Sequence, residues 1–83
     1  MDRKELAELG YEDALVFNFP SYDDAIVGVT TDDRVVYDYK KMVRHLMKDM
    51  KCSYGEAVVF LEYNTVRSLD YMGDDAPVIV TFL

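Results

Sequence analysis

The stretch from Ser53 to Pro77 constrains the fold more than any other part of this sequence. Its start is a helix signal, because the Ser53 hydroxyl can accept from the amide three residues on and Glu56 can reach back to the Ser53 amide. Its end is a stop signal, since Gly73 can adopt the left-handed conformation that closes a helix and Pro77 cannot continue one. The sequence therefore predicts one long helix between these signals.

The apolar face of this predicted helix is wide. Ala57, Phe60 and Tyr63 lie beside an apolar stripe at helical spacing, whose members are Tyr54, Val58, Leu61, Thr65, Leu69 and Met72. A helix that is apolar over so much of its circumference should be buried on more than one side. We therefore expect it at the centre of the molecule.

Three segments before this helix have the composition of strands. Residues 14–19, 25–30 and 34–37 are rich in β-branched and aromatic side chains, and turn-forming residues separate them. The short connection at residues 31–33 predicts an antiparallel hairpin between the second and third segments, and Gly28 indicates a bulge or a close approach of another backbone. Residues 78–83 predict a fourth strand, which we expect to lie beside another strand because so apolar an edge is hazardous when free.

Two further helices are predicted. Asp2 is a candidate cap for a short helix over residues 2–9, and Asp38 for an amphipathic helix over residues 39–51. The second helix buries one apolar arc and exposes a basic face, made of Lys40, Lys41, Arg44, Lys48 and Lys51. The element order is then α-β-β-β-α-α-β. Residues 1–83 are expected to form a single α+β domain, a small, mostly antiparallel sheet of about four strands with two main helices on one face.

Composition limits the cellular compartments and the kinds of partner that can be expected for this chain. A single cysteine, Cys52, predicts a reducing compartment, and no apolar run is long enough to cross a bilayer or act as a signal peptide. These features predict a cytoplasmic protein without a membrane partner. The net charge of −7 argues against direct binding of nucleic acid. The charge is uneven, because residues 40–51 carry +4 and the remainder carries −11.

Candidate catalytic and metal-binding groups are few. His45, the one histidine, is predicted on the solvent-facing side of its helix, and Cys52 has no identifiable partner base. The acidic pairs at residues 23–24, 32–33 and 74–75 fall in predicted turns and lack the ligand spacing of a calcium loop. No phosphate-binding, dinucleotide or zinc motif is present. The sequence thus predicts no cofactor, no metal and no assigned catalytic residue.

The polar residues of the long helix are the better candidates for a binding site: Glu62, Asn64, Arg67 and Tyr71. Asn64 and Arg67 are three residues apart and share one side of a helix. They could form a binding site, or they could be structural, with Asn64 bonded to a loop and Arg67 paired to Asp70, Glu62 or a C-terminal carbonyl. The basic face of the preceding helix has two interpretations as well, a contact for an acidic partner or a solvated helix face.

Two long segments of the sequence resemble the pattern of a known protein family. FPSYDDAIVGVTTDDRVVYDYKKMV and CSYGEAVVFLEYNTVRSLDYMGDDAPVIV span residues 19–43 and 52–80. They resemble a family of small proteins from Firmicutes and their phages or prophages, with the pattern VVYDYxKMV followed by SYxEAxxFxEYNTxRxLxYMGxxAPxI. The resemblance covers nearly the whole chain but implies no activity.

The chain departs from this pattern at several positions. Asn18 and Phe19 replace Asp-Asn, Asp33 replaces the turn glycine, and Lys40 and Arg44 replace acidic or neutral residues. The basic helix face is therefore peculiar to this chain. Positions that match the pattern include four of the candidates above, Glu62, Asn64, Arg67 and Tyr71.

The function predicted from the sequence is a non-enzymatic protein-interaction module. A small acidic protein can mimic the charge of nucleic acid and occupy a basic groove on another protein, which suits a phage or mobile-element accessory role. The alternative is a ligand-binding domain or small enzyme with a site near Asn64, Arg67 and Tyr71. A homodimer is a further possibility, because so small a core often gains stability from association.

Overall fold

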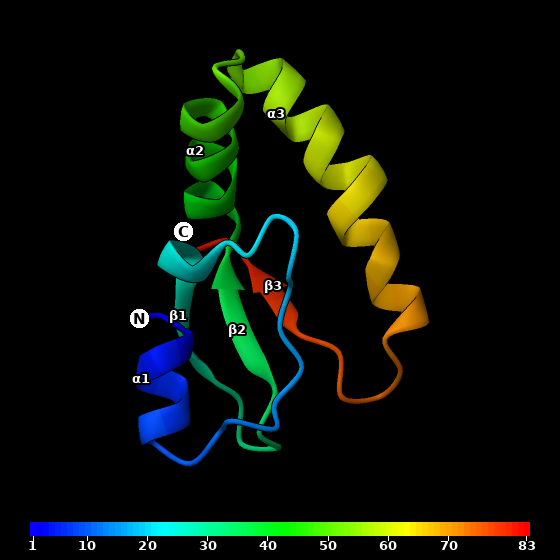
Figure 1. Ribbon diagram of the computed structural model, residues 1–83. Helices are drawn as coiled ribbons and strands as arrows, with labels where there is room; N and C mark the ends of the chain where they lie inside the picture. Colours follow the sequence, from blue (N-terminus) through cyan, green and yellow to red (C-terminus); the bar gives the residue numbers. More distant parts are fainter.

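The computed structural model describes residues 1–83 and belongs to the α+β class, as predicted (Figure 1). It contains three α-helices and one three-stranded sheet, whose bounds are α1 Arg3–Glu8, β1 Ile26–Val29, β2 Val35–Asp38, α2 Tyr39–Met50, α3 Tyr54–Phe60 and β3 Val78–Val80. Three further helical segments are not α-helical. These are the 3₁₀ turns η1 Asp23–Ala25 and η3 Leu69–Tyr71, and the π-helical segment η2 Leu61–Val66. None of the helices combines the length and the apolar character needed to cross a membrane.

The sheet is mixed rather than mostly antiparallel. β1 and β2 form the predicted antiparallel hairpin, and the register shifts between Ile26 and Gly28, which confirms the bulge. β3 pairs with β2 in parallel, with Val36 opposite Val78. The parallel direction follows from the connection, because two helices carry the chain from one end of β2 back to the other.

The prediction of a strand over residues 14–19 is wrong. This segment is extended, but side chains rather than a neighbouring strand satisfy its backbone at Phe17. The Phe17 N–H donates to the Tyr37 hydroxyl at 3.1 Å, and the Phe17 carbonyl accepts from the Arg3 guanidinium. The segment therefore packs against the core without extending the sheet, which keeps three strands instead of four.

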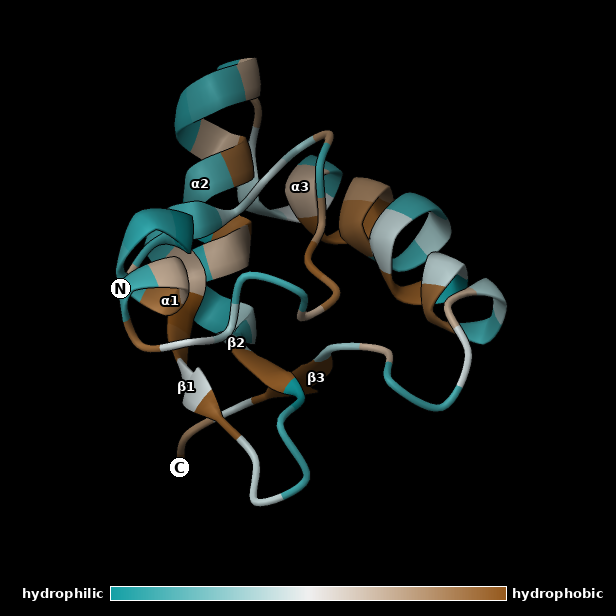
Figure 2. Ribbon diagram, turned by 60° about the horizontal axis from the view of Figure 1, so that its bottom comes forward, coloured by the Kyte–Doolittle hydropathy of each residue, from teal (hydrophilic) through white to brown (hydrophobic).

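The predicted helix starts are confirmed. The Asp2 carboxylate accepts from the Glu5 N–H, and the Asp38 carboxylate from the Lys40 N–H, both at 2.9 Å. Asp38 is also the last residue of β2, so α2 begins without a linker and stands beyond the end of that strand (Figure 1). Figure 2 shows the helices on one side of the sheet, with no helix on the opposite side.

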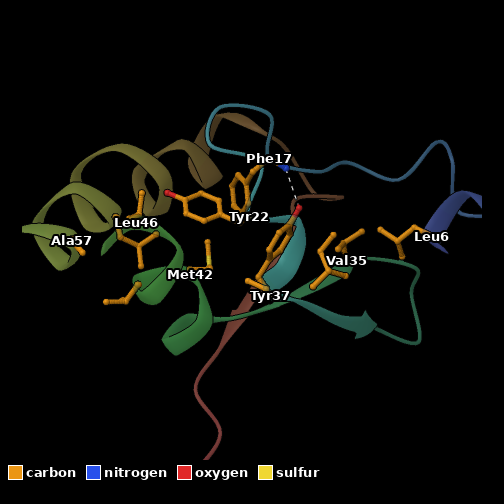
Figure 3. Close-up of a cluster of buried hydrophobic side chains, with 12 residues drawn as sticks. Leu6, Phe17, Tyr22, Val35, Tyr37, Met42, Leu46 and Ala57 are labelled. Atoms are coloured by element: carbon orange, nitrogen blue, oxygen red, sulfur yellow. Dashed lines mark hydrogen bonds between the residues drawn. The ribbon is translucent and has the colours of Figure 1, made fainter. Parts of the chain in front are cut away.

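The core lies where the extended segment, β2 and α2 meet (Figure 3). Phe17 packs against the rings of Tyr37 and Tyr22, with centroid separations of 4.8 and 5.9 Å. Burial raises the pKa of both tyrosine hydroxyls above its ordinary value, although the hydrogen bond with the Thr65 hydroxyl at Tyr22 and the bond that Tyr37 accepts from the Phe17 N–H oppose this. The bond between the Tyr22 and Thr65 hydroxyls is 2.7 Å long and ties the core to η2.

The long C-terminal helix is peripheral, which corrects the expectation that it lies at the centre. Along α3 and η2, full burial is limited to Ala57, Leu61 and Thr65. In Figure 1, α3 leaves the top of α2 and descends at an angle, away from the sheet. A chain of 83 residues has too few elements to surround a second helix, so much of the wide apolar face is only half-buried, and Tyr54 and Tyr63 are exposed.

Candidate functional site

The α3 segment begins as predicted and then changes its helical form. The capping box is complete, since the Glu56 N–H donates to Ser53 Oγ at 3.2 Å and the Ser53 N–H donates to Glu56 Oε1 at 3.3 Å. The α-helix ends at Phe60, where the π-helical η2 begins. Gly73 has a φ of 82°, which confirms it as the left-handed stop.

Asn64 lies inside the π-helical segment and stabilises it. Its side-chain amide donates to the Phe60 carbonyl at 3.1 Å. A π-helix bonds each amide to the carbonyl five residues back instead of four, and the asparagine side chain adds a donor to the carbonyl four residues back. Such π segments are frequent at functional sites, so η2 remains a candidate position for one.

Arg67 is exposed and takes part in no ion pair, so the structural pairing with Asp70 or Glu62 is absent. Its guanidinium instead lies over the Tyr63 ring, 5.9 Å from the centroid. A guanidinium over an aromatic face is attracted by the ring's negative face. Tyr63 is itself 65% exposed, so this stacked pair stands on the surface of the molecule.

The other two predicted site residues lie elsewhere. Glu62 accepts a hydrogen bond from the Tyr39 hydroxyl at 3.1 Å and thereby links η2 to α2. Burial, then the hydrogen bond and charge of Glu62, raises the pKa of the Tyr39 hydroxyl. Tyr71 belongs to η3 and is 89% exposed. All four candidates are exposed, but they do not converge in one cavity.

An open apolar groove of about 540 Å³ runs along α3 beside the end of α2. Val59, Tyr63 and Asn64 line its α3 side, and Met50 lines its α2 side. Arg67 continues this surface through its contact with the Tyr63 ring. We call these five residues the α3 outer surface: Met50, Val59, Tyr63, Asn64 and Arg67. The structure thus brings Asn64 and Arg67 together on one surface, whereas Glu62 and Tyr71 do not border the groove.

A second, smaller hollow lies on the other side of Asn64. It has a volume of about 230 Å³ and separates Asn64, Thr65 and Ser68 from residues 16–20. Phe19, on the rim of this hollow, is 99% exposed. Asn64 therefore borders two hollows, the apolar groove along α3 and a smaller hollow of mixed polarity.

The charge around the α3 outer surface is acidic. Residues 53–75 carry five carboxylates and one guanidinium, a net charge of −4. The carboxylates belong to Glu56, Glu62, Asp70, Asp74 and Asp75, and the guanidinium to Arg67. The basic face of α2 belongs to a different helix, where Lys48 lies beside Asp23, Asp24 and Asp49.

His45 is less exposed than the sequence predicted. Its ring packs on the buried Tyr22 ring at a centroid distance of 5.5 Å, and its Nδ1 lies 3.2 Å from Asp24 Oδ1. It borders a polar hollow of about 510 Å³ together with Ser21, but the two side chains share no hydrogen bond. The Asp24 pair and the Tyr22 contact give His45 a packing role that its position on a basic helix did not reveal.

The remaining candidates are structural in their contacts. Cys52 is partly buried at the corner between α2 and α3, where its thiol donates to the Leu46 carbonyl at 3.7 Å. The side chains of His, Cys, Asp and Glu form no cluster of three or more that could hold a metal ion. The acidic pairs lie where turns were predicted; Asp33, for example, has a φ of 66° after β1.

Sequence reasoning missed Phe19, Met50 and Val59 as surface residues. Val59, Tyr63 and Arg67 follow one another at a spacing of four, which places them on one side of a helix and was the available signal. That signal was hidden, because Tyr63 was counted with the packing face. Comparison of the chain with protein-family models, with curated proteins and with solved structures finds no match.

Proposed function

We propose that this chain is a non-enzymatic protein-binding domain and that the α3 outer surface is its contact surface. The observation that carries the proposal is the stacked Tyr63–Arg67 pair, exposed beside an apolar groove on a helix with one packed side. Tyrosine, arginine and methionine are enriched at protein interfaces, and tyrosine and arginine are prominent among the residues that dominate binding energy.

The partner proposed is a protein with an apolar projection bordered by basic side chains. The groove offers an apolar floor, and the net charge of −4 over residues 53–75 favours a positively charged rim on the partner. The groove of a protein that binds nucleic acid is positively charged in this way. The phage or mobile-element accessory role, which suits the small size and acidic charge of the chain, stays a prediction within this proposal.

The alternative, a small-ligand site formed by Asn64, Arg67 and Tyr71, has weaker support. Asn64 borders the groove, Arg67 stacks on Tyr63, and Tyr71 lies in a separate helical turn with its side chain in solvent. A ligand site normally gathers a few polar groups in a concave, enclosed pocket. No cavity here is lined by all three side chains together.

A photo-crosslinking amino acid at position 63, introduced in the host cell, tests the proposal. We expect one basic protein to be crosslinked from position 63 and not from position 9, where Leu9 has a matched exposure of 63% against 65% for Tyr63. The purified partner is then titrated with the wild type and two variants. Tyr63→Ala should weaken binding by about tenfold or more, as expected for an interface aromatic, whereas Leu9→Ala should not change it.

Salt provides a second readout. Binding to a basic partner should weaken as the ionic strength rises, because the attraction between the two surfaces is screened. Equal crosslinking from both positions, or an unchanged dissociation constant for Tyr63→Ala with an unchanged melting temperature, would overturn the proposal.

A further inference from the structure

A different surface, the free edge of β3, carries an inference that does not depend on α3. The strand order is β1-β2-β3, so β3 has a neighbour on one side only. No backbone or side-chain hydrogen bond outside the ladder with β2 involves any of residues 78–83. The outward N–H and C=O groups of this edge are therefore available to another strand.

This edge lacks the devices that normally protect one. Residues 78–83 read Val-Ile-Val-Thr-Phe-Leu, with no charged side chain and no proline, whereas Pro77 and the pair Asp74–Asp75 stand just before them. β-branched and aromatic residues favour extended pairing, and charged or proline residues on an edge oppose it. Phe82 is 57% exposed, and Leu83 is also in solvent. An edge of this composition is a ready template for another chain.

The opposite edge of the sheet is protected. β1 contains the bulge between Ile26 and Gly28, which interrupts regular pairing. Acidic pairs also stand at both of its ends, Asp23–Asp24 before the strand and Asp32–Asp33 after it. A second strand approaching β1 would meet a kinked ladder and four carboxylates. Both edge strands have an acidic pair shortly before their first residue, but only β1 has a bulge in its ladder and a second acidic pair after its end, so β1 is the better protected edge.

The total exposed area also indicates an unused interface. The chain exposes 5549 Å², whereas a compact monomer of 9.6 kDa is expected to expose about 5,100 Å². The excess of about 450 Å² is roughly half of the ~800 Å² that each partner contributes to a standard interface. Pairing of a further strand edge, with burial of its flanking side chains, would remove this excess exposed area.

We propose that a second copy of this chain pairs with the β3 edge, β3 against β3 in antiparallel direction, to form a continuous six-stranded sheet. Two identical edges related by a two-fold axis make a self-complementary contact. Their side chains present no like charges to each other, although each copy has a net charge of −7. The assembly stops at two copies, because only the protected β1 edges remain at its ends.

Sedimentation velocity over a range of protein concentrations tests this with three variants. Thr81→Pro removes an amide just beyond β3, and Phe82→Lys places like charges near the two-fold axis. Leu9→Lys is the control, since it places the same charge at a similarly exposed apolar residue, the C-cap of α1. We expect a wild-type dimer, a dimer dissociation constant raised about tenfold or more by each edge variant, and no change in the control.

Hydrogen exchange locates the contact. The amides of residues 78–83 should become protected as the protein concentration rises, and higher salt should strengthen the dimer because it screens the repulsion between two acidic copies. This salt response is opposite to that of the proposed basic partner, so the two proposals fail separately. A monomer at every concentration, a dimer without protection at residues 78–83, or equal weakening by Leu9→Lys would overturn the pairing.

Discussion

α2 and α3 are both rich in apolar residues, but they use them differently. On α2, Met42, Val43 and Leu46 are at most 1% exposed, whereas Val59 and Tyr63 on the α3 side are 57% and 65% exposed. α2 lies against β2, η1 and α3, so its apolar arc is covered from several directions. α3 has cover on one side only. The number of neighbouring elements, rather than apolar content, decides how much of each helix belongs to the core.

Substituting one residue from each helix should separate these roles most strongly. Leu46→Ala should lower the free energy of unfolding by about 2–5 kcal/mol, because a fully buried side chain leaves a cavity. Val59→Ala should change it by less than about 0.5 kcal/mol, as surface substitutions do. Urea unfolding measures both. Similar losses for the two variants would mean that Val59 is packed in solution and that α3 is not peripheral.

The tie between η2 and the core should have a smaller but distinctive effect. Tyr22→Phe removes the 2.7 Å bond and leaves the buried Thr65 hydroxyl without this partner, which should cost about 1–3 kcal/mol. The double variant Tyr22→Phe, Thr65→Val removes both hydroxyls and should recover part of that loss. A double-mutant cycle by urea unfolding measures the coupling between them. Strictly additive losses would show that the bond does not hold η2 to the core.

Alkaline pH should weaken the packed side of the molecule. Burial raises the folded-state pKa of the Tyr22 and Tyr37 hydroxyls, so the unfolded chain releases these protons first. Their contribution to stability is complete below the unfolded pKa of about 10 and is lost as the pH rises from there through the folded pKa values. Urea unfolding at a series of pH values should show this decline. Tyr37→Phe should flatten the decline and the exposed Tyr63→Phe should not; an equal response of both variants would contradict the assignment.

Local signals in the sequence predicted much of the fold. The caps at Asp2, Asp38 and Ser53, the stop at Gly73 and the bulge at Gly28 each depend on a few adjacent residues, and all are present. Features set by distant contacts were not predictable in this way. The 14–19 segment has a strand's composition, but a tyrosine hydroxyl from β2 and an arginine from α1 satisfy its backbone at Phe17.

The candidate site likewise combines features that follow from local sequence with features that depend on distant contacts. Helical spacing predicted that Asn64 and Arg67 share a side of the helix, and both belong to the α3 outer surface. The role of Glu62 as a link to Tyr39 depends on how α2 and η2 meet, which no local pattern encodes. Val59 and Tyr63 are exposed because no other element covers them. Apolar periodicity in a sequence cannot show whether a helix face will be covered.

The bond between Tyr22 and Thr65 has a consequence for recognising relatives of this chain. The two residues are 43 positions apart and share one buried hydrogen bond, so an apolar side chain at either position removes the partner of the other. Positions coupled in this way should vary together: a relative with phenylalanine at position 22 should carry valine or alanine at position 65. Tyr37 adds a second constraint, because its hydroxyl accepts from the main chain at Phe17 whatever side chain stands there. In a diverged sequence, this trio is a more specific signature than any continuous stretch.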